Sequence, residues 1–546
     1  MSSTSVSNNE KLLRLLYLSN TSPKYISGNP DKYSLPQIDA TIFDEYLKLP
    51  EEFLKTIETV SAYNIHPQRK TIFYALARFL NTQKLPEEVK SKITKTAIDI
   101  SKSDEDFFDY LKFCTTFRTG KTKISTCVRK RVKAFYKNKT AEELVDSYIL
   151  HKSVHGWDHR TLLKLTHIKS DTLSKNLVIN YILLNDVKTE NIKDETSMKL
   201  IENLKEINTL RTTKDVAVAL PIINKFKLTH HHLTPFLQKH QEAWNAVISN
   251  MSIRDILKSL PKLYRLGFLK QNLEVYKIIV ACLTDAEKIK KDQIFPLEIF
   301  IALKNFEKGG KPVDPKLIDH LTKEKKLGEE ELAKAKTLVE PKCPNIVNNI
   351  HKCLSMSYSN IQSTGLKFLI TIDVTESMNL PCLHSKNITS IEAALAITLS
   401  FLKSEKNVTT ALFKDKDIQL INFKSSDSYS DNLKKLKEHK STYMIPFSGV
   451  EWALHKNKSF DVLINFVHHH EFSSAVPKEH RDKISRGLKS IHKYQETVNK
   501  SAKIVNICLA TSRLVIADES RNIIDIAGLD EGVPKVLHTF LNGKFC

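Results

Sequence analysis

Three oxygen-bearing residues, Asp373, Thr375 and Ser377, alternate directly after an apolar run of the chain. Residues 368–372 are all apolar or β-branched, which predicts a strand buried on both faces, as in a parallel sheet. Ligands of open α/β sheets bind beyond the carboxyl ends of the strands. A carboxylate and two hydroxyls at alternate positions can direct three oxygens to one point, as a hard cation such as Mg²⁺ requires. The spacing therefore predicts a candidate cation site at the end of this strand.

The patterns on either side of this strand divide the chain into two kinds of structure. Before it, helical patterns follow one another without strands, which indicates an α-solenoid related to HEAT arrays. After it, strands and helices alternate, which predicts a mostly parallel, doubly wound sheet. The fold class is thus multidomain, α followed by α/β. We expect a disordered N-terminus over 1–9, a helical domain over 10–360 and an α/β domain over 361–546.

Individual elements can be placed from the same patterns. The segment 23–36 is rich in Pro, Ser, Gly and Asn and is expected to form a loop. The breaker Lys308–Pro312 precedes an expected charged helix around 316–340. The strands of the α/β domain are expected at 366–373, 408–413, 418–423, 460–467, 503–509 and 513–517.

A strongly basic segment lies in the helical half. Residues 121–139 include eight Lys or Arg and no acid. Ile124, Val128 and Val132 recur at helical spacing and predict a buried stripe, while cations occupy a neighbouring face. Like charges at this spacing destabilise an isolated helix by roughly a few tenths of a kcal/mol per pair. A phosphate backbone would offset that repulsion.

A second basic segment covers residues 156–169. Asp158 is a plausible N-cap, and the residues after it repeat apolar positions at helical spacing. Arg160, Lys164 and His167 then share the outer face of this helix. Trp157, just before the cap, is interpreted as a packing anchor rather than a platform for stacking bases.

The composition favours a polyanionic partner inside the cell. Lys and Arg outnumber Asp and Glu by 83 to 62, a formal charge of +21. That balance favours RNA, DNA or an anionic membrane surface without indicating a fold. The eight cysteines form no CxxC pair, which argues against a zinc ribbon or a disulfide scaffold. We find neither a secretory signal nor a transmembrane run, and therefore expect an intracellular protein.

Several motifs, taken in order, resemble the sixty-kilodalton Ro (SS-A) ribonucleoprotein family. The segments 128–130 and 156–167 resemble its TROVE module, and 294–303 is similar to the last helical section of that module. Phe368–Met378 resembles the opening of the family's von Willebrand factor A domain, and 510–532 follows its closing pattern. The likeness extends from about residue 9 to residue 545.

The resemblance implies a ring of HEAT-like helices closed by a Rossmann-like von Willebrand factor A domain. In that family the basic outer surface binds small Y RNAs, and the central hole receives single-stranded 3′ ends of misfolded small RNAs. His167 matches a histidine associated with Y RNA contact, and Lys152 matches a nearby basic position. Two other basic positions of the family fall on Leu150 and Val154, which shifts the expected contact toward His151, His155 and Arg160. The expected RNA-binding residues are Lys121, Lys123, Arg129, Lys130, Arg131, Lys133, Lys137, Lys152, His159, Arg160, Lys164, His167 and Lys169.

The metal site departs from the family pattern. Asp373, Thr375 and Ser377 fit its Asp-x-Ser-x-Ser motif, but the later threonine ligand has only Ser448 as a counterpart. The final aspartate is replaced by the histidine run 468–470, and neutral imidazole is a poor ligand for Mg²⁺. We therefore favour a metal-free domain over one that binds Mg²⁺. Both this run and His230–His232 are interpreted as solvated loops, since consecutive histidines rarely complete a tetrahedral zinc site.

These observations favour a non-catalytic RNA-binding protein of a small ribonucleoprotein particle, acting in RNA quality control. The expected partners are Y-like RNAs and misfolded small RNAs, with no membrane, and the chain is expected to be a monomer in the cytoplasm and also the nucleus. The alternative is a protein-interaction scaffold that captures an acidic partner through a metal at Asp373. No residue set typical of a hydrolase appears, so a nuclease has little support.

Overall fold

A computed structural model describes residues 6–28, 41–82, 85–117, 124–151, 153–170, 172–186, 194–307, 343–468, 481–512, 517–518 and 520–545. The chain divides into two compact units. The first contains residues 1–10, 20–37 and 251–546, and the second contains 11–19 and 38–250. The expected charged helix around 316–340 and its preceding breaker lie outside the described residues.

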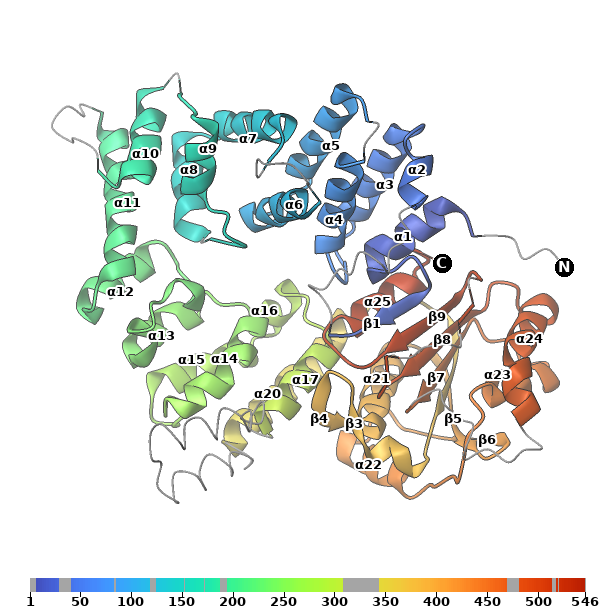
Figure 1. Cartoon of the computed structure of the whole chain (residues 1–546). Coiled ribbons are helices and arrows are strands. Elements are labelled where there is room, and N and C mark those ends of the chain that lie inside the picture. Colours follow the sequence, from blue (N-terminus) through green and yellow to red (C-terminus); the bar gives the residue numbers. More distant parts are fainter. Residues whose placement is uncertain are drawn as a thin grey trace, which may run out of the picture. The chain divides into compact units, whose positions relative to one another are not determined.

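The second unit is built from helices in succession (Figure 1). Its core combines aliphatic residues with aromatic ones, of which Phe53, Phe79, Phe107 and Phe108 are fully buried. Neighbouring helices pack in pairs, with α4 on α6, α5 on α7, and α10 on both α8 and α9. The helices are α1 (Asn8–Leu18), α2 (Thr41–Glu45), α3 (Pro50–Ala62), α4 (Lys70–Leu80), α5 (Glu87–Asp99), α6 (Asp104–Thr116), α7 (Thr126–Asn138), α8 (Ala141–Leu150), α9 (His159–Thr166), α10 (Leu173–Leu184), α11 (Glu195–Thr212), α12 (Val216–Lys225) and α13 (Gln241–Ile248).

The first unit is organised around a seven-stranded sheet with the order β1-β9-β8-β7-β2-β5-β6. Every neighbouring pair is parallel except β5 and β6, so the mostly parallel sheet expected from the sequence is confirmed. The central strands β2 and β7 are buried along almost their whole length, which explains why their sequences are mostly apolar. The strands are β1 (Lys24–Ile26), β2 (Lys367–Ile372), β5 (Asn407–Lys414), β6 (Asp417–Ile421), β7 (Val462–Val467), β8 (Lys503–Cys508) and β9 (Ile523–Ala527), with a separate pair β3 (Pro381–Cys382) and β4 (Ser385–Thr389).

The first unit also contains helices, some of which follow strands of the sheet and some of which precede β2 in the sequence (Figure 1). The helices that follow strands are α21 (Ser390–Ser404), α22 (Tyr429–Lys437), α23 (Ser448–His455), α24 (Arg481–Thr497) and α25 (Val533–Leu541). The helices of this unit that precede β2 in sequence are α14 (Ile253–Arg265), α15 (Glu274–Leu283), α16 (Ala286–Lys291), α17 (Pro296–Glu307) and α20 (Pro344–Ser357).

Contacts thus group α14 to α20 with the sheet, although the sequence predicts a boundary near residue 360. The reason is visible at α17, where Lys304 Nζ donates to Glu392 Oε1 at 3.1 Å. Asn387 also donates to the side chain of Asn305 at 2.9 Å. Polar residues of α17 are therefore paired with the first turns of the α/β domain.

The edge of the sheet formed by β1 differs from the sequence prediction. The segment 23–36 is predicted to be a loop, but Lys24–Ile26 forms β1 and pairs in parallel with β9. Tyr25 is 1% exposed, and its hydroxyl lies 3.1 Å from both carboxylate oxygens of Asp530. Gly28 N donates to Asp530 as well, at 2.7 Å. A three-residue strand is too short to show a periodic pattern, so only its distant partner makes it recognisable.

The last strand also differs from the prediction. Of the expected strand 513–517, residues 513–516 lie outside the described residues and Ala517 is not in a strand. The strand beside β8 is β9, whose apolar run is interrupted by Asp525. Asp525 is fully buried, where it accepts a hydrogen bond from Asn506 at 3.0 Å, and Asn506 accepts one from Asn465. This polar row across three strands satisfies the buried carboxylate.

Candidate nucleic-acid interface

The helix α7 separates its apolar and basic residues onto different faces. Ser125 caps its start by accepting a hydrogen bond from Val128 N at 3.2 Å. Val128, Val132 and Tyr136 are buried, as the sequence predicts for the first two. The exposed residues of α7 include the cations Arg129, Lys130, Lys133 and Lys137.

These four cations have no carboxylate partner within the described residues. Arg131 differs from them: its Nε donates to Ser91 Oγ at 3.0 Å, and the residue is half-buried. Arg131 therefore attaches α7 to α5 and is less accessible than its neighbours. Lys121, Lys123 and Lys152 lie outside the described residues.

The short helix α9 presents the second basic face. Asp158 is its N-cap and accepts a hydrogen bond from Thr161 N at 2.6 Å, as predicted. Arg160, Lys164, His167 and Lys169 are all exposed. His167 ends the helix in the left-handed conformation, with φ 48°, which turns the chain out of the helix. The guanidinium of Arg160 also donates to Leu183 O, at 3.1 Å from Nε and 2.8 Å from Nη2.

His159 does not belong to this exposed surface. It is expected from the sequence to contact RNA, yet it is only 1% exposed. Its Nδ1 lies 2.8 Å from Tyr136 Oη, and its Nε2 lies 3.3 Å from Asp104 Oδ2. The prediction that His159 contacts RNA is wrong because adjacent residues of a helix point in different directions. Its neighbours Asp158 and Arg160 are more accessible than His159. His159 joins α9 to α6 and α7 from inside.

Asp104 is the charged centre of this buried group. Burial by itself raises the pKa of Asp104, but the nearby imidazole of His159, the hydroxyl of Ser147 and the ammonium of Lys139 outweigh it. The net result is a pKa well below the ordinary value. Lys139 Nζ lies 3.3 Å from Asp104 Oδ1 and donates to Ser147 Oγ at 2.8 Å. The carboxylate is therefore ionised and fixes three helices beneath the basic faces.

The replacement contacts expected near residues 151–160 are partly engaged within the protein. His155 Nε2 lies 2.8 Å from Asp109 Oδ1. His151 is half-buried, and burial lowers its pKa below the ordinary value. Trp157 is 5% exposed and is thus a packing residue, as predicted. The accessible cations of this region are those of α7 and the outer face of α9.

The predicted cation site is assembled at the carboxyl end of β2, but with few donors. Asp373 is buried, and its Oδ1 accepts a hydrogen bond from Thr375 N at 2.8 Å. The hydroxyls of Thr375 and Ser377 lie 2.9 Å apart. Ser448 Oγ donates to Lys416 O at 3.4 Å. His468, expected to be solvated, is 9% exposed at the end of β7.

This donor set does not fit a resident Mg²⁺. The described residues bring one carboxylate and two hydroxyls together, and the chain has His468 where the resemblance implies a second acid. Magnesium demands hard oxygen ligands, and imidazole is not one. The other histidine run forms a short 3-10 helix, His230–His232, in which His230 and His232 are half-buried rather than solvated.

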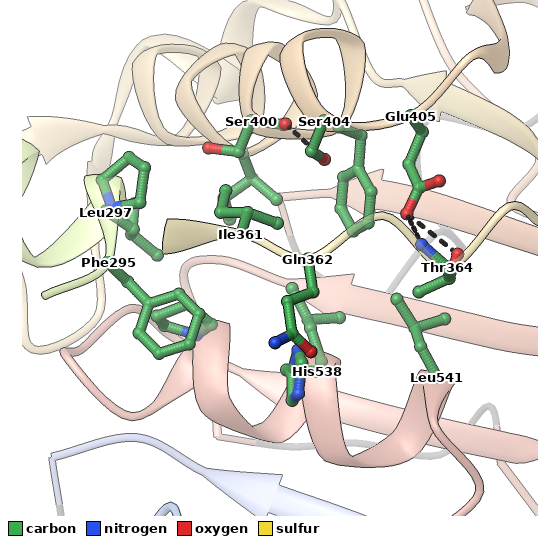
Figure 2. A pocket seen from close by; sticks show the side chains of 15 residues that line it. Phe295, Leu297, Ile361, Gln362, Thr364, Ser400, Ser404, Glu405, His538 and Leu541 are labelled. Carbon is green, nitrogen blue, oxygen red and sulfur yellow. Dashed lines mark hydrogen bonds between the residues drawn. The ribbon is translucent and has the colours of Figure 1, made fainter. Parts of the chain in front are cut away.

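A small apolar pocket lies where the chain enters the sheet (Figure 2). Phe295, Phe401 and Leu541 line it, and its volume is about 60 Å³. The buried carboxylate of Glu405 accepts hydrogen bonds at the rim from Thr364 N at 2.7 Å and Ser363 Oγ at 2.8 Å. The volume is far below the roughly 300 Å³ of a small-molecule site. We interpret this region as the joint that fixes the segment leading into β2.

No helix within the described parts of the chain combines the length and apolar character that crossing a membrane requires.

Comparison with known proteins identifies relatives that cover most of the chain. Residues 367–541 match the model of the Ro60 vWA domain. The RNA-binding protein RO60 of Caenorhabditis elegans is 22% identical over 497 residues, which cover 82% of this chain and 72% of that protein. The RNA-binding protein RO60 of Deinococcus radiodurans is 19% identical over 425 residues, covering 76% and 72%. The crystal structure of the Deinococcus radiodurans RO (RSR) protein superposes with a TM-score of 0.80 at 16% identity, covering 98% of this chain and all of that one.

Proposed function

From the similarity of the chain to the Ro60 proteins in sequence and fold, we propose that it binds RNA through the exposed basic faces of α7 and α9. The observation that carries this proposal is the set of exposed cations without a carboxylate partner in the described residues, Arg129, Lys130, Lys133, Lys137, Lys164 and Lys169. Arg160 and His167 extend the same surface.

Unneutralised cations on adjacent helices suit a phosphate backbone for a physical reason. Phosphate contacts supply affinity and position the nucleic acid, and they release condensed counterions on binding. Cations already held by carboxylates would gain less from such contacts. The helices α7 and α9 pack on each other, so one duplex or folded strand can meet both faces.

The finer function follows from the resemblance. We propose that the bound RNAs are Y-like small RNAs on the outer surface, and single-stranded 3′ ends of misfolded small RNAs in the hole of a ring of helices. The role is then RNA quality control in a small ribonucleoprotein particle, without catalysis, in the cytoplasm and also the nucleus.

Charge reversal on α7 tests the proposal directly. The variant Arg129→Glu/Lys130→Glu/Lys133→Glu removes three exposed cations that make no internal ion pair in the described residues. The control Lys55→Glu/Lys199→Glu/Lys205→Glu makes the same charge change on exposed lysines of α3 and α11. Binding of a labelled RNA hairpin with a single-stranded 3′ tail is measured by filter retention between 50 and 200 mM salt.

We expect the α7 variant to lose about 2 to 3 in the slope of log K against log salt, since each contact contributes roughly 0.7 to 0.9. The control should lose markedly less. If both variants lose affinity equally, the net charge of the chain is responsible and α7 is not the binding face. Retention of wild-type slope in the α7 variant would also refute the proposal.

A further inference from the structure

A polar cleft that was not recognised in the sequence opens beside the basic faces. It lies between the end of α7, the start of α8 and the start of α10, and its volume is about 390 Å³. That size is within the range of ligand-binding pockets. Its lining includes four lysines and one carboxylate, Lys137, Lys139, Lys169, Lys175 and Glu142.

The four lysines of the lining differ in their contacts and exposure. Lys139 is held inside by Asp104 and Ser147. Lys137 and Lys169 are exposed and have no carboxylate partner in the described part of the chain, so their ammonium groups can turn into the cleft. Among the described residues that line the cleft, Glu142 is the acidic one, and it is exposed at the start of α8. The charge balance of these described lining residues is positive.

Lys175 prepares the floor of the cleft. It is 5% exposed, and its ammonium donates to Lys137 O at 2.8 Å and to Lys139 O. These carbonyls belong to the last turn of α7, where a helix carries partial negative charge. Without Lys175 this helix end would repel an anion. With it, the floor is neutralised and the first turn of α10 adds positive potential at the wall.

Hydroxyl groups complete the lining. Ser170, Thr172 and Ser174 lie along the approach to α10 and its first turn. Thr172 is exposed, its hydroxyl lies 3.3 Å from Ser170 Oγ, and it makes no side-chain hydrogen bond to the helix that it precedes. Hydroxyls and ammonium groups around a concave surface are the donors that bind phosphate oxygens in protein–nucleic acid interfaces.

We infer that this cleft seats a backbone phosphate of the RNA that lies on α7 and α9, with Lys137, Lys169 and the Thr172 hydroxyl as its donors and Lys175 as a positioning residue. The inference rests on the proposed function and adds a defined phosphate position to it. Lys169 directly follows the segment that ends α9, so a strand leaving the outer face of α9 reaches the cleft next.

The substitution Thr172→Trp tests the cleft without changing any charge. Because Thr172 caps no N–H group, the start of α10 should survive the change. The control is Leu173→Trp, which adds the same aromatic side chain at an adjacent residue that is 65% exposed and does not line the cleft. The probe is the hairpin RNA described above with hydroxyl groups at both ends, so that only backbone phosphates can fill the cleft.

We expect Thr172→Trp to lower the salt slope by roughly 0.7 to 0.9, which reduces the ratio of affinities at 50 and 200 mM salt about threefold. Lys169→Gln should have a similar effect, and the double variant should lose no more than either alone, since both remove one contact. Leu173→Trp should bind like the wild type.

Wild-type binding by Thr172→Trp would overturn the inference, and so would additive losses in the double variant. The proposed function would stand in that case, because reversal of charge on α7 tests it separately. If the wild-type chain binds no RNA, both proposals fall together.

Discussion

Replacing the buried histidine of α9 should weaken the helical unit without removing an RNA contact. In His159→Leu, the buried hydroxyl of Tyr136 loses its partner at 2.8 Å, and the carboxylate of Asp104 loses the imidazole whose Nε2 lies 3.3 Å away. An unsatisfied buried hydroxyl costs about 1–3 kcal/mol, and removing one member of a buried ionic contact adds to that cost. Some relaxation is expected, so we predict a loss of about 3 kcal/mol of stability in this region.

Hydrogen exchange followed by mass spectrometry can localise this loss. Amides of α7 and α9 that exchange only when the region opens should exchange about 100-fold faster, because 1.4 kcal/mol corresponds to a factor of ten. Peptides from the sheet supply an internal reference. The matched control is His167→Leu, since His167 is exposed and surface substitutions usually change stability by less than about 0.5 kcal/mol.

In an RNA-binding measurement the order of the two effects should be reversed, with the larger effect in His167→Leu. His167→Leu should weaken binding while leaving exchange unchanged. His159→Leu should weaken binding only under conditions that unfold α9. Equal protection of α7 and α9 in His159→Leu and wild type would refute the reasoning, and a double variant with Tyr136→Phe should lose less than the sum of both losses because the two residues share one interaction.

Three further outcomes are expected. The pKa of Asp104 is lower in the folded chain than the unfolded value of about 3.9, so its stabilising contribution is present above that pH and is lost as the pH falls toward the folded pKa. In wild type, the helical circular dichroism should therefore decrease below about pH 4. The variant Asp104→Asn should show a weaker dependence on pH in this range. Added Mg²⁺ should leave the melting temperature unchanged in both wild type and Asp373→Ala, whereas a rise in the wild type alone, of the kind that gives about 2.7 kcal/mol at 100 times Kd, would show a functional metal site. Glu405→Ala should cost about 2–4 kcal/mol by releasing its hydrogen bonds with Ser363 and Thr364, and hydrogen exchange that is unchanged over residues 361–366 would contradict this.

Local signals in the sequence were sufficient for much of the helical unit. The cap at Asp158 and the apolar stripe of α7 depend on residues within one or two turns, so the sequence alone places them correctly. The buried strands β2, β7 and β8 are recognisable for the same reason, since apolar or β-branched residues fill most of each strand.

Features that depend on distant partners could not be predicted in this way. The ring of His159 is buried beside Asp104 and Tyr136, and those residues lie 55 and 23 positions away in the chain. The cleft beside α10 depends on Lys175 reaching the end of α7, 36 to 38 positions earlier. A buried lysine is improbable from its residue type alone, and its partners are main-chain carbonyls that carry no sequence signal.

The pairing of β1 with β9 has a consequence for biosynthesis. The edge of the sheet closes only when residues 523–527 meet residues 24–26, which left the ribosome about 500 residues earlier. During translation residues 24–26 remain unpaired until β9 has been synthesised. In a product that lacks β1, the backbone edge of β9 would be open to pairing with other chains. A tag fused close to residue 24 should therefore reduce the yield of non-aggregated protein. A fragment that begins at β2, and so lacks β1, should do the same, although neither change touches the basic helices.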